Sequence, residues 1–468
     1  MNINENFRYL NTGLPDDILR RKLHGDFEGA IRLIDRRLLD KSTPAALRGC
    51  LLVQKEICQI MPTEYPYTAA EALNLLKEYI PDFTEDEFND WIDEGKLSWI
   101  YINGEMHFFN RFFQTLCKTD AVFISRVTKP LPADDNPEKG KQRKQQLKDC
   151  IRLMKEKGKS SKRIRIHASL KMKDGQFTPG MFVRVHLPVP AACEQQSDIV
   201  IEKVFPANGQ VSPENDLQRT VCWEENMKEN HEFYVEYSYI HTAVYHHAEI
   251  HEERNASDFI TEEELLAFIQ EESPHIVFTP YIRALVNDLT EGISDPLEKA
   301  RKFYDFITLN MRYNFVPPYF ILENIPESCA RNFTGDCGVF ALLFITLCRC
   351  AGIPACWQSG LAAQLETCGP HDWARFYTEA KGWLYVDASF GVSAARDNDE
   401  ERRNFYFGNL DSHRMVANNA FQKPFSIDKD HWRADPYDNQ VGEIETADKG
   451  LKSGEFETVQ EVLLCEEI

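Results

Sequence analysis

The spacing of apolar and polar positions divides the chain into a helical first part, a stranded middle part and a mixed last part. Apolar residues recur every three or four positions in residues 27–39, which predicts an amphipathic helix, and helices are also expected at 44–61 and 68–79. Alternating apolar and polar residues predict strands at 164–168, 181–190, 199–204, 219–223 and 232–240. This order of elements indicates an α+β protein of several domains.

The first 130 residues also carry local signals for a helix start and a hairpin. Thr84, followed three residues later by Glu87, is a capping box and predicts a helix start. Asn103-Gly104 is a preferred hairpin turn, so short strands are expected on both sides of it. Helices followed by such a hairpin resemble a winged-helix unit, but the acidic helix at 85–94 argues against DNA contact. A packing or substrate-docking module is the favoured interpretation.

Two polar stretches connect or follow these regions. Residues 131–162 open with prolines and continue as a helix rich in lysine, arginine and glutamine. We favour a solvated helix there, and the alternative is contact with an acidic partner or with the protein's own acidic surface. Residues 426–468 form an acidic tail, in which 438–455 is expected to be loop or disordered and 458–465 a final strand or helix.

The strongest pattern begins at Gly335 and ends near residue 390. Cys337 stands directly before the apolar run 339–350, which predicts a buried helix that ends at Gly352. Two strands follow, at 373–378 and 383–387, joined by a turn at 380–382. Cys337 is therefore expected at a helix N-terminus, next to a two-stranded hairpin.

These positions suit the chemistry of a thiol nucleophile. A helix N-terminus favours the thiolate, because it carries partial positive charge and unpaired N–H groups. The hairpin can bring His371 and Asp387 side by side, so that the carboxylate orients the imidazole that serves as base. Taken singly, each residue is more often structural, so the interpretation depends on the three together.

The acyl oxyanion would need hydrogen-bond donors. The backbone N–H of Cys337 is the first candidate. Tyr313 and Tyr319 are candidates for the second donor, and both are equally suited to packing.

Composition narrows the classes of function. The chain has 468 residues and a net charge of −21, which disfavours a general binder of nucleic acids or anionic membranes. No signal-peptide pattern and no apolar run of membrane-spanning length is found, and the 13 cysteines lack paired spacings. A cytoplasmic protein with reduced thiols is expected, with no structural metal and no cofactor.

Several motifs together resemble the core of the transglutaminase-like superfamily. They are Gly335-Asp336-Cys337-Gly338, Gly352-Ile353-Pro354-Ala355, His371-Asp372-Trp373 and the Trp-Leu-Tyr-Val-Asp-Ala run at 383–388. The likeness extends over about residues 250–422. The chain is similar to bacterial multidomain members of the superfamily. Family members more often have alanine where this chain has Asp372, a departure that is expected to touch no proposed role.

The residue patterns and the resemblance together predict a layout of domains. Residues 1–130 would form a mainly helical N-terminal domain and 131–162 a linker with a polar helix. A β-sandwich at 163–247 would precede a papain- and transglutaminase-like catalytic core at 248–425, and 426–468 would be the acidic tail.

The resemblance also implies a reaction class. Cys337 would be the nucleophile, His371 the base and Asp387 the orienting carboxylate of an enzyme that transfers acyl groups from peptide or carboxamide bonds. Hydrolysis of a protein or peptide substrate is slightly favoured, because the core shows no acidic cluster typical of a calcium site. The alternatives are a transglutaminase that transfers glutamine acyl groups to amines, and a scaffold protein that retains the fold without turnover.

Overall fold

The computed structural model describes residues 3–132, 137–246, 262–365 and 367–468. The chain divides into two compact units. The larger unit comprises residues 1–4, 139–312 and 325–468, and the smaller unit comprises 5–138 and 313–324. The expected boundary at 247/248 falls outside the described residues, as does part of the expected linker.

The smaller unit is mainly helical. Its helices are α1 (Asp16–Leu23), α2 (Phe27–Leu39), α3 (Ala45–Glu64), α4 (Ala69–Tyr79), α5 (Glu85–Asp93), α6 (Phe112–Thr119) and α7 (Ala121–Arg126), with 3-10 turns η1 (Ile3–Tyr9) and η4 (Tyr319–Ile321). Strands β1 (Tyr67–Thr68), β2 (Trp99–Ile102) and β3 (Glu105–Phe108) form a sheet in the order β1-β3-β2. The capping box of Thr84 and Glu87 is confirmed, as is the hairpin turn, where Asn103 has a φ of 51°.

A short segment from later in the chain completes the smaller unit. Residues 313–324 were expected within the catalytic core, but they pack here instead. The Arg111 guanidinium lies 3.5 Å from the ring centre of Phe315, and the Phe320 ring lies 5.8 Å from that of Phe7. These aromatic contacts stabilise the packing of residues 313–324 within the smaller unit, although the residues on either side belong to the larger unit.

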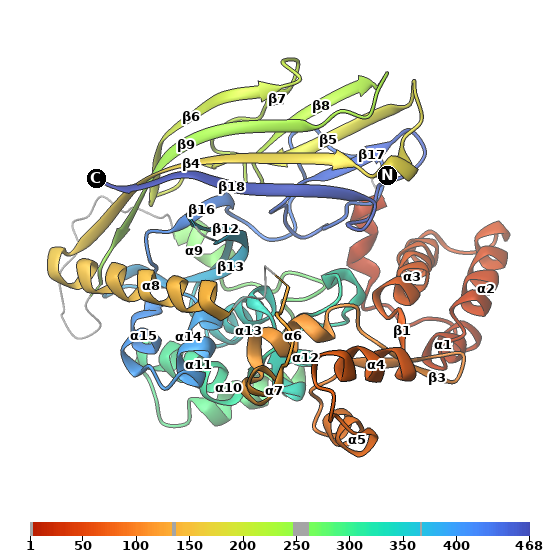
Figure 1. Ribbon diagram of the computed structural model, residues 1–468, viewed down its shortest axis with the longest axis horizontal. Coiled ribbons are helices and arrows are strands. Elements are labelled where there is room, and N and C mark those ends of the chain that lie inside the picture. Colours follow the sequence, from red (N-terminus) through yellow and green to blue (C-terminus); the bar gives the residue numbers. More distant parts are fainter. Residues whose placement is uncertain (1–2, 133–136, 247–261, 366) are drawn as a thin grey trace. The chain divides into compact units, whose positions relative to one another are not determined.

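A β-sandwich lies in the larger unit, as the alternating pattern predicts. One sheet has the order β18-β4-β9-β6, with β4 (Lys159–Met172), β6 (Gln196–Phe205), β9 (Phe233–Val244) and β18 (Phe456–Glu467). The other has the order β17-β5-β8-β7, with β5 (Phe182–Pro188), β7 (Gln210–Val211), β8 (Thr220–Asn226) and β17 (Glu443–Thr446). Ile166, Val185 and Trp223 from the two sheets are buried in one core, and Figure 1 shows β4, β9 and β18 running side by side.

The C-terminal residues correct the prediction of an acidic tail. Part of the stretch expected to be loop or disordered forms β17, which is buried along its whole length and pairs with β5. The last strand, β18, pairs with β4 along nearly all of its length. The acidic residues of β18 are exposed, which explains why its composition resembles that of a solvated tail, and the strand itself agrees with the expectation of a final strand or helix at 458–465.

A further sheet of the larger unit, here called the core sheet, is antiparallel and has the order β15-β14-β13-β12-β16. Its strands are β12 (Ala355–Gln364), β13 (Thr367–Thr378), β14 (Gly382–Val386), β15 (Phe407–Gly408) and β16 (Arg414–Asn418). Leu361 and Met415 of this sheet belong to the same apolar core as the sandwich. The β-domain and the core expected at 163–247 and 248–425 are therefore parts of one compact unit.

Helices complete the larger unit. They are α8 (Pro137–Lys157), α9 (Glu262–Ala267), α10 (Pro280–Leu289), α11 (Pro296–Asn310), α12 (Ile325–Asn332), α13 (Cys337–Cys350), α14 (Ala388–Arg396) and α15 (Glu400–Phe405), with the 3-10 turn η3 (Asp174–Gln176) and the short strands β10 (Arg312–Tyr313) and β11 (Thr334–Gly335). Helix α13 packs on the core sheet, where the Phe344 ring lies 5.7 Å from the ring of Phe376 on β13.

We expected the basic helix α8 to be a solvated helix, but it also forms ion pairs within the protein. Lys144 and Lys148 pair with Asp397 and Asp399 at 2.7 and 3.0 Å, and Lys155 pairs with Glu401 at 2.7 Å. The alternative is confirmed, namely that this helix contacts the protein's own acidic surface. Its lysines offset the negative charge of residues 397–401, and Figure 1 shows α8 beside α14 and α15.

Candidate active site

Cys337 stands at the first position of α13, as the sequence predicts. The Asp336 side chain caps the helix by accepting a hydrogen bond from the backbone N–H of Val339 at 3.2 Å. Residues 338–349 are buried all round, so the helix axis is held firmly against the sheet. The helix ends where Gly352 has a φ of +78°, a left-handed conformation that favours glycine.

The surroundings of Cys337 differ from those of most other cysteines. Its side chain is half-buried, whereas Cys348 on the same helix is fully buried. Burial raises the pKa of the Cys348 thiol far above its ordinary value and that of Cys58 to about 11. Cys348 is thus a small core residue.

Gly335 allows close packing at the start of α13. A Cβ atom at this position would lie 2.4 Å from Cγ1 of Val339. The glycine therefore lets the chain pass close to the first turn of α13.

The hairpin of β13 and β14 brings His371 and Asp387 together. Ala374 pairs with Val386 in the antiparallel register, so the residues just beyond this pair lie at the same end of the hairpin. His371 Nε2 lies 2.7 Å from Asp387 Oδ2, and both side chains are buried. Asp387 also caps α14 by accepting a hydrogen bond from the N–H of Phe390 at 2.8 Å.

A buried arginine completes the surroundings of Asp387. Arg414 Nη1 lies 2.9 Å from Asp387 Oδ2, and its Nε donates to Asp411 Oδ2 at 3.2 Å. Arg414 is 0% exposed, and its guanidinium lies 4.6 Å from the ring centre of Phe390. Our sequence analysis assigned no role to Arg414 or Asp411, although a charged residue in an otherwise apolar strand signals a buried partner.

These contacts set the charges of His371 and Asp387. Burial by itself would raise the pKa of Asp387, but the charges of His371 and Arg414 outweigh it and hold the pKa below its ordinary value. Burial lowers the pKa of His371, and Asp387 opposes that effect. The arrangement can therefore present a neutral imidazole oriented by an ionised carboxylate.

Asp372, next to His371, contacts the thiol directly. The Cys337 Sγ donates a hydrogen bond to Asp372 Oδ2 at 3.1 Å. Gln440 Nε2 donates to Asp372 Oδ1 at 2.7 Å and to the backbone oxygen of His371 at 3.0 Å. The expectation that Asp372 touches no proposed role is wrong, because this carboxyl contacts the sulfur of Cys337.

Burial raises the pKa of Asp372 to about 8, and the nearby carboxylate of Asp336 adds to the effect. Asp438 is hydrogen-bonded to Asp372 and also contacts the hydroxyl of Ser359. The pKa of Asp438 is raised well above its ordinary value, first by burial and then by Asp372. A cluster of carboxyl groups therefore lies against the thiol.

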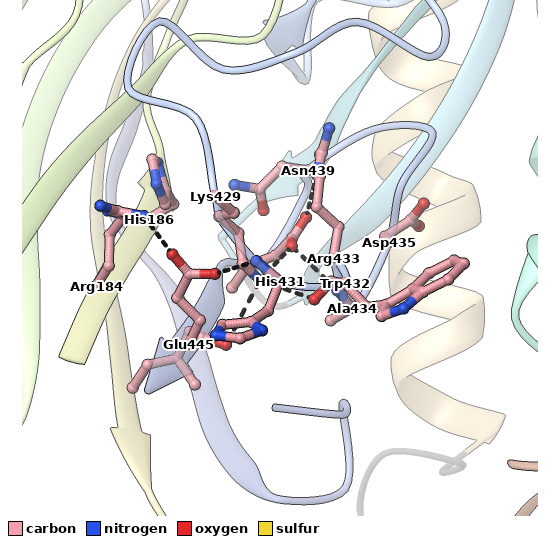
Figure 2. A network of polar contacts seen from close by, with 12 residues as sticks. Arg184, His186, Lys429, His431, Trp432, Arg433, Ala434, Asp435, Asn439 and Glu445 are labelled. Atoms are coloured by element: carbon pink, nitrogen blue, oxygen red, sulfur yellow. Dashed lines mark hydrogen bonds and ion pairs between the residues drawn. The ribbon is translucent and has the colours of Figure 1, made fainter. Parts of the chain in front are cut away.

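The C-terminal strap, residues 428–442, carries Asp438 and Gln440 to this cluster. Buried ion pairs hold the strap to the sandwich: Lys429 Nζ lies 3.0 Å from Glu443 Oε2, and Arg433 Nε lies 2.9 Å from Glu443 Oε1. Figure 2 shows the next anchor, Glu445, which binds Arg184 of β5 on one side and the backbone N–H of His431 on the other. The stretch expected to be a tail thus supplies side chains to the candidate site.

Other expectations for the site have mixed outcomes. Tyr313 and Tyr319, the candidate second oxyanion donors, belong to the smaller unit. Among the described residues, no group of three or more histidine, cysteine, aspartate or glutamate side chains is placed to hold a metal ion. The absence of a metal and of a cofactor stays a prediction. In the described ranges, no helix is both long and apolar enough to cross a membrane.

Comparison with known proteins gives a family for the core. Solved structures similar to this chain include a candidate cysteine protease from Cytophaga hutchinsonii (15% identity, 66% of this chain and 91% of that chain, TM-score 0.43). Another is the periplasmic domain of TgpA from Pseudomonas aeruginosa (13% identity, 55% of this chain and 96% of that chain, TM-score 0.29). No curated protein matches the sequence. Residues 283–388 match the model of the transglutaminase-like superfamily, so the chain carries a core of that superfamily, and this range contains Cys337, His371 and Asp387.

Proposed function

We propose that this protein is a cysteine-nucleophile enzyme that cleaves peptide or carboxamide bonds by acyl transfer. Cys337 is the nucleophile, His371 the general base and acid, and Asp387 the residue that orients the imidazole. The observation that carries the proposal is the 2.7 Å contact between His371 Nε2 and Asp387 Oδ2, on a hairpin beside the helix that begins at Cys337. The superfamily match of residues 283–388 supports an enzyme of this class.

The first half of the reaction uses groups already described. Because Asp387 holds Nε2 of His371, Nδ1 is the nitrogen that takes the thiol proton. The sulfur of Cys337 then bonds to the carbonyl carbon, and the oxygen becomes an oxyanion facing the N–H groups at the start of α13. His371 returns its proton to the departing amine, which leaves a thioester on Cys337.

Arg414 tunes this step through charge. Asp387 and Asp411 carry two negative charges, and the guanidinium groups of Arg414 and Arg143 both lie near them. The carboxylate of Asp387, in direct contact with His371, stabilises the imidazolium which forms when His371 accepts the thiol proton. Arg414 also fixes the Asp387 carboxylate, so the imidazole is held in one orientation.

In the second half of the reaction, water resolves the thioester, so the protein acts as a peptidase or amidase. Resolution by a lysine-like amine would instead make it a transglutaminase. The substrate is a protein or peptide, and the smaller unit serves as a packing or docking module for it. A cytoplasmic location remains the prediction made from the sequence.

Activity profiling tests the proposal. Wild type, Cys337→Ala and Asp387→Asn are compared on a peptide-amide library and on a glutamine-donor peptide with an amine probe. We expect hydrolysis by wild type, none by Cys337→Ala, and a rate about 10²–10⁴-fold lower for Asp387→Asn, since its amide cannot stabilise the imidazolium. Asparagine can still cap α14, so this variant should fold.

Two outcomes would change the assignment. Amine incorporation without hydrolysis would make the protein a transglutaminase. If iodoacetamide modified Cys337 near pH 6 no faster than the half-buried Cys465, the thiol would not be activated, and a scaffold protein would be the better description.

A further inference from the structure

One cation lies close to the proposed triad without belonging to it. The guanidinium of Arg143, on α8, lies 4.9 Å from the ring centre of Phe390, and this ring centre lies 4.5 Å from that of His371. Among the described residues, no group forms a hydrogen bond or an ion pair with the Arg143 guanidinium. The residue is half-buried, so its charge is only partly hydrated. A cation in such a place is stabilised when an anion binds to it.

The carboxylates near Arg143 are already bound to another arginine. Asp387 and Asp411 both contact Arg414, whose Nη1 lies 2.9 Å from Asp387 Oδ2 and whose Nη2 donates to Asp411 Oδ2. Burial lowers the pKa of Arg143, and the like charge of Arg414 lowers it further. The surroundings therefore leave Arg143 available to an anion from outside the protein.

Helix α8 holds Arg143 in a fixed place. The next residue, Lys144, pairs with Asp397 at 2.7 Å. Gln364 Nε2, on β12 of the core sheet, donates to Gln146 Oε1 at 3.1 Å. Because these contacts lie directly after Arg143 along the helix, the guanidinium is positioned by the fold at the edge of the site.

The position of Arg143 selects one side of the substrate. In the proposed reaction, His371 returns its proton to the departing amine, so the amine nitrogen lies next to the imidazole. One aromatic ring, that of Phe390, separates the imidazole from Arg143. The first residue after the cleaved bond therefore extends from the imidazole toward a free guanidinium.

We propose that Arg143 is a specificity-determining residue that binds a carboxylate of the substrate on the amine side of the cleaved bond. The preferred substrate is then a peptide in which the first residue after that bond carries a carboxylate, either on its side chain or as the end of the chain. The inference rests on the proposed function, which supplies the cleaved bond. A guanidinium suits this role, because its planar fork binds a carboxylate through two parallel hydrogen bonds.

The charge of Arg143 also acts on His371. Burial lowers the pKa of His371, and the charges of Arg414 and Arg143 lower it further, against the opposing effect of Asp387. A carboxylate bound to Arg143 offsets one of these positive charges. An acidic substrate is therefore expected to bind more tightly and also to ease proton transfer to the imidazole.

Two matched pairs of peptides test the inference on the full-length wild-type protein. All are pooled N-acetylated peptides, randomised on the acyl side. The first pair has glutamate or glutamine directly after the cleaved bond and ends in a carboxamide, and the second ends in alanine as free acid or as amide. We expect kcat/KM to be about 10–100-fold higher for the acidic member of one pair. Preference in the first pair identifies a side-chain carboxylate and preference in the second a chain end, whereas no preference in either pair overturns the inference.

Variants of α8 show whether the preference comes from Arg143. Arg143→Gln removes the charge and keeps a good helix former, so we expect the preference to be lost, with the neutral peptides cleaved about as fast as by wild type. Arg143→Lys keeps the charge without the fork and should retain part of the preference. Arg152→Gln, on the same helix with a side chain that is 70% exposed, is the matched control and should change nothing.

An equal loss on acidic and neutral peptides would overturn the inference, because Arg143 would then only balance the charge of Asp387 and Asp411. An acidic preference that survives in Arg143→Gln would overturn it as well. If the variants fold poorly, the comparison of the peptides on wild type still decides whether a substrate carboxylate is recognised.

Binding without turnover separates this inference from the proposed function. Protection of Cys337 against iodoacetamide by each peptide, read by mass spectrometry, reports occupancy of the site. Acidic peptides that protect Cys337 but are not cleaved would overturn the proposed reaction and leave Arg143 as a carboxylate-binding residue. Cleavage without acidic preference overturns only the role of Arg143, and neither cleavage nor protection overturns both proposals.

Discussion

Two buried aspartates flank the same histidine, and their surroundings shift their pKa values in opposite directions. Asp387 follows β14 and meets Arg414 at 2.9 Å and His371 at 2.7 Å. Asp372 precedes Trp373 on β13 and meets the Cys337 thiol and another carboxyl group, that of Asp438. The pKa of Asp387 is held below its ordinary value, while that of Asp372 is raised to about 8.

Burial is the largest effect on both groups and acts in the same direction, so it does not explain the difference. What differs is the charge of the surrounding groups: His371 and Arg414 lower the pKa of Asp387, whereas the carboxyl groups of Asp336 and Asp435 raise that of Asp372. At similar depth, the pKa is therefore lowered on one side of the site and raised on the other.

The largest effect is expected when the cation beside Asp387 is removed. Arg414→Met leaves Asp387 and Asp411 buried without their shared partner, so we expect a loss of about 3–5 kcal/mol in the free energy of unfolding, together with loss of activity. Urea denaturation measures the first effect. Adding Asp411→Asn should recover part of the stability, because one uncompensated carboxylate is then gone.

A surface arginine provides the control for this prediction. Arg165 also pairs with two carboxylates, Glu202 and Glu236, but its side chain is 41% exposed. Arg165→Met should cost less than about 1 kcal/mol, since exposed ion pairs contribute little. Equal losses for Arg165→Met and Arg414→Met would show that burial of the pair is not what matters.

A smaller effect is expected on the pH dependence of the free energy of unfolding. Folding raises the pKa of Asp372 from 3.8 to about 8, so between these values the folded state binds more protons than the unfolded state at this group. The contribution of Asp372 is thus fully present below pH 3.8 and is lost as the pH rises toward 8. Relative to wild type, Asp372→Asn should become more stable by about 1.4 kcal/mol per pH unit at most between pH 5 and pH 7.

Urea denaturation of both proteins at pH 5, 6 and 7 checks this trend. A stability difference that stays constant across these values would contradict a raised pKa for Asp372. Asp430→Asn, a substitution at an exposed position, serves as the control for the loss of one carboxyl group from the protein.

The smallest effect is expected at the back of the carboxyl cluster. Ser359→Ala removes the hydroxyl that contacts Asp438 and accepts from Asn418. We expect a loss of about 1–2 kcal/mol in the free energy of unfolding, because one buried hydrogen-bonding group loses its partners. If Asp438 shifts away from Asp372 as a result, the pH midpoint for modification of Cys337 by iodoacetamide should shift as well. No change in either quantity would show that Ser359 does not position the cluster.

The predictable part of the site is the part encoded by short stretches. The turn at 380–382 joins two strands whose pairing brings His371 and Asp387 to the same end of the hairpin, so their contact followed from local pattern alone. The start of α13 at Cys337 likewise followed from the apolar run behind it. The contact of Asp372 with the thiol was missed, although an acidic residue in a buried strand is itself a signal that it has a partner.

The sequence by itself determined the larger set of elements: the helices of the smaller unit, the alternating strands of the sandwich, and α13 with the hairpin that follows it. These depend on periodicity, caps and turns, which act within a few residues. Only the tertiary structure decided which distant groups meet, such as Arg414 with Asp387, and the strap of residues 428–442 with Asp372. The reason is that strand partners and buried ion pairs are chosen by burial and charge after the chain has folded, and β17 and β18 find their partners more than 250 residues away.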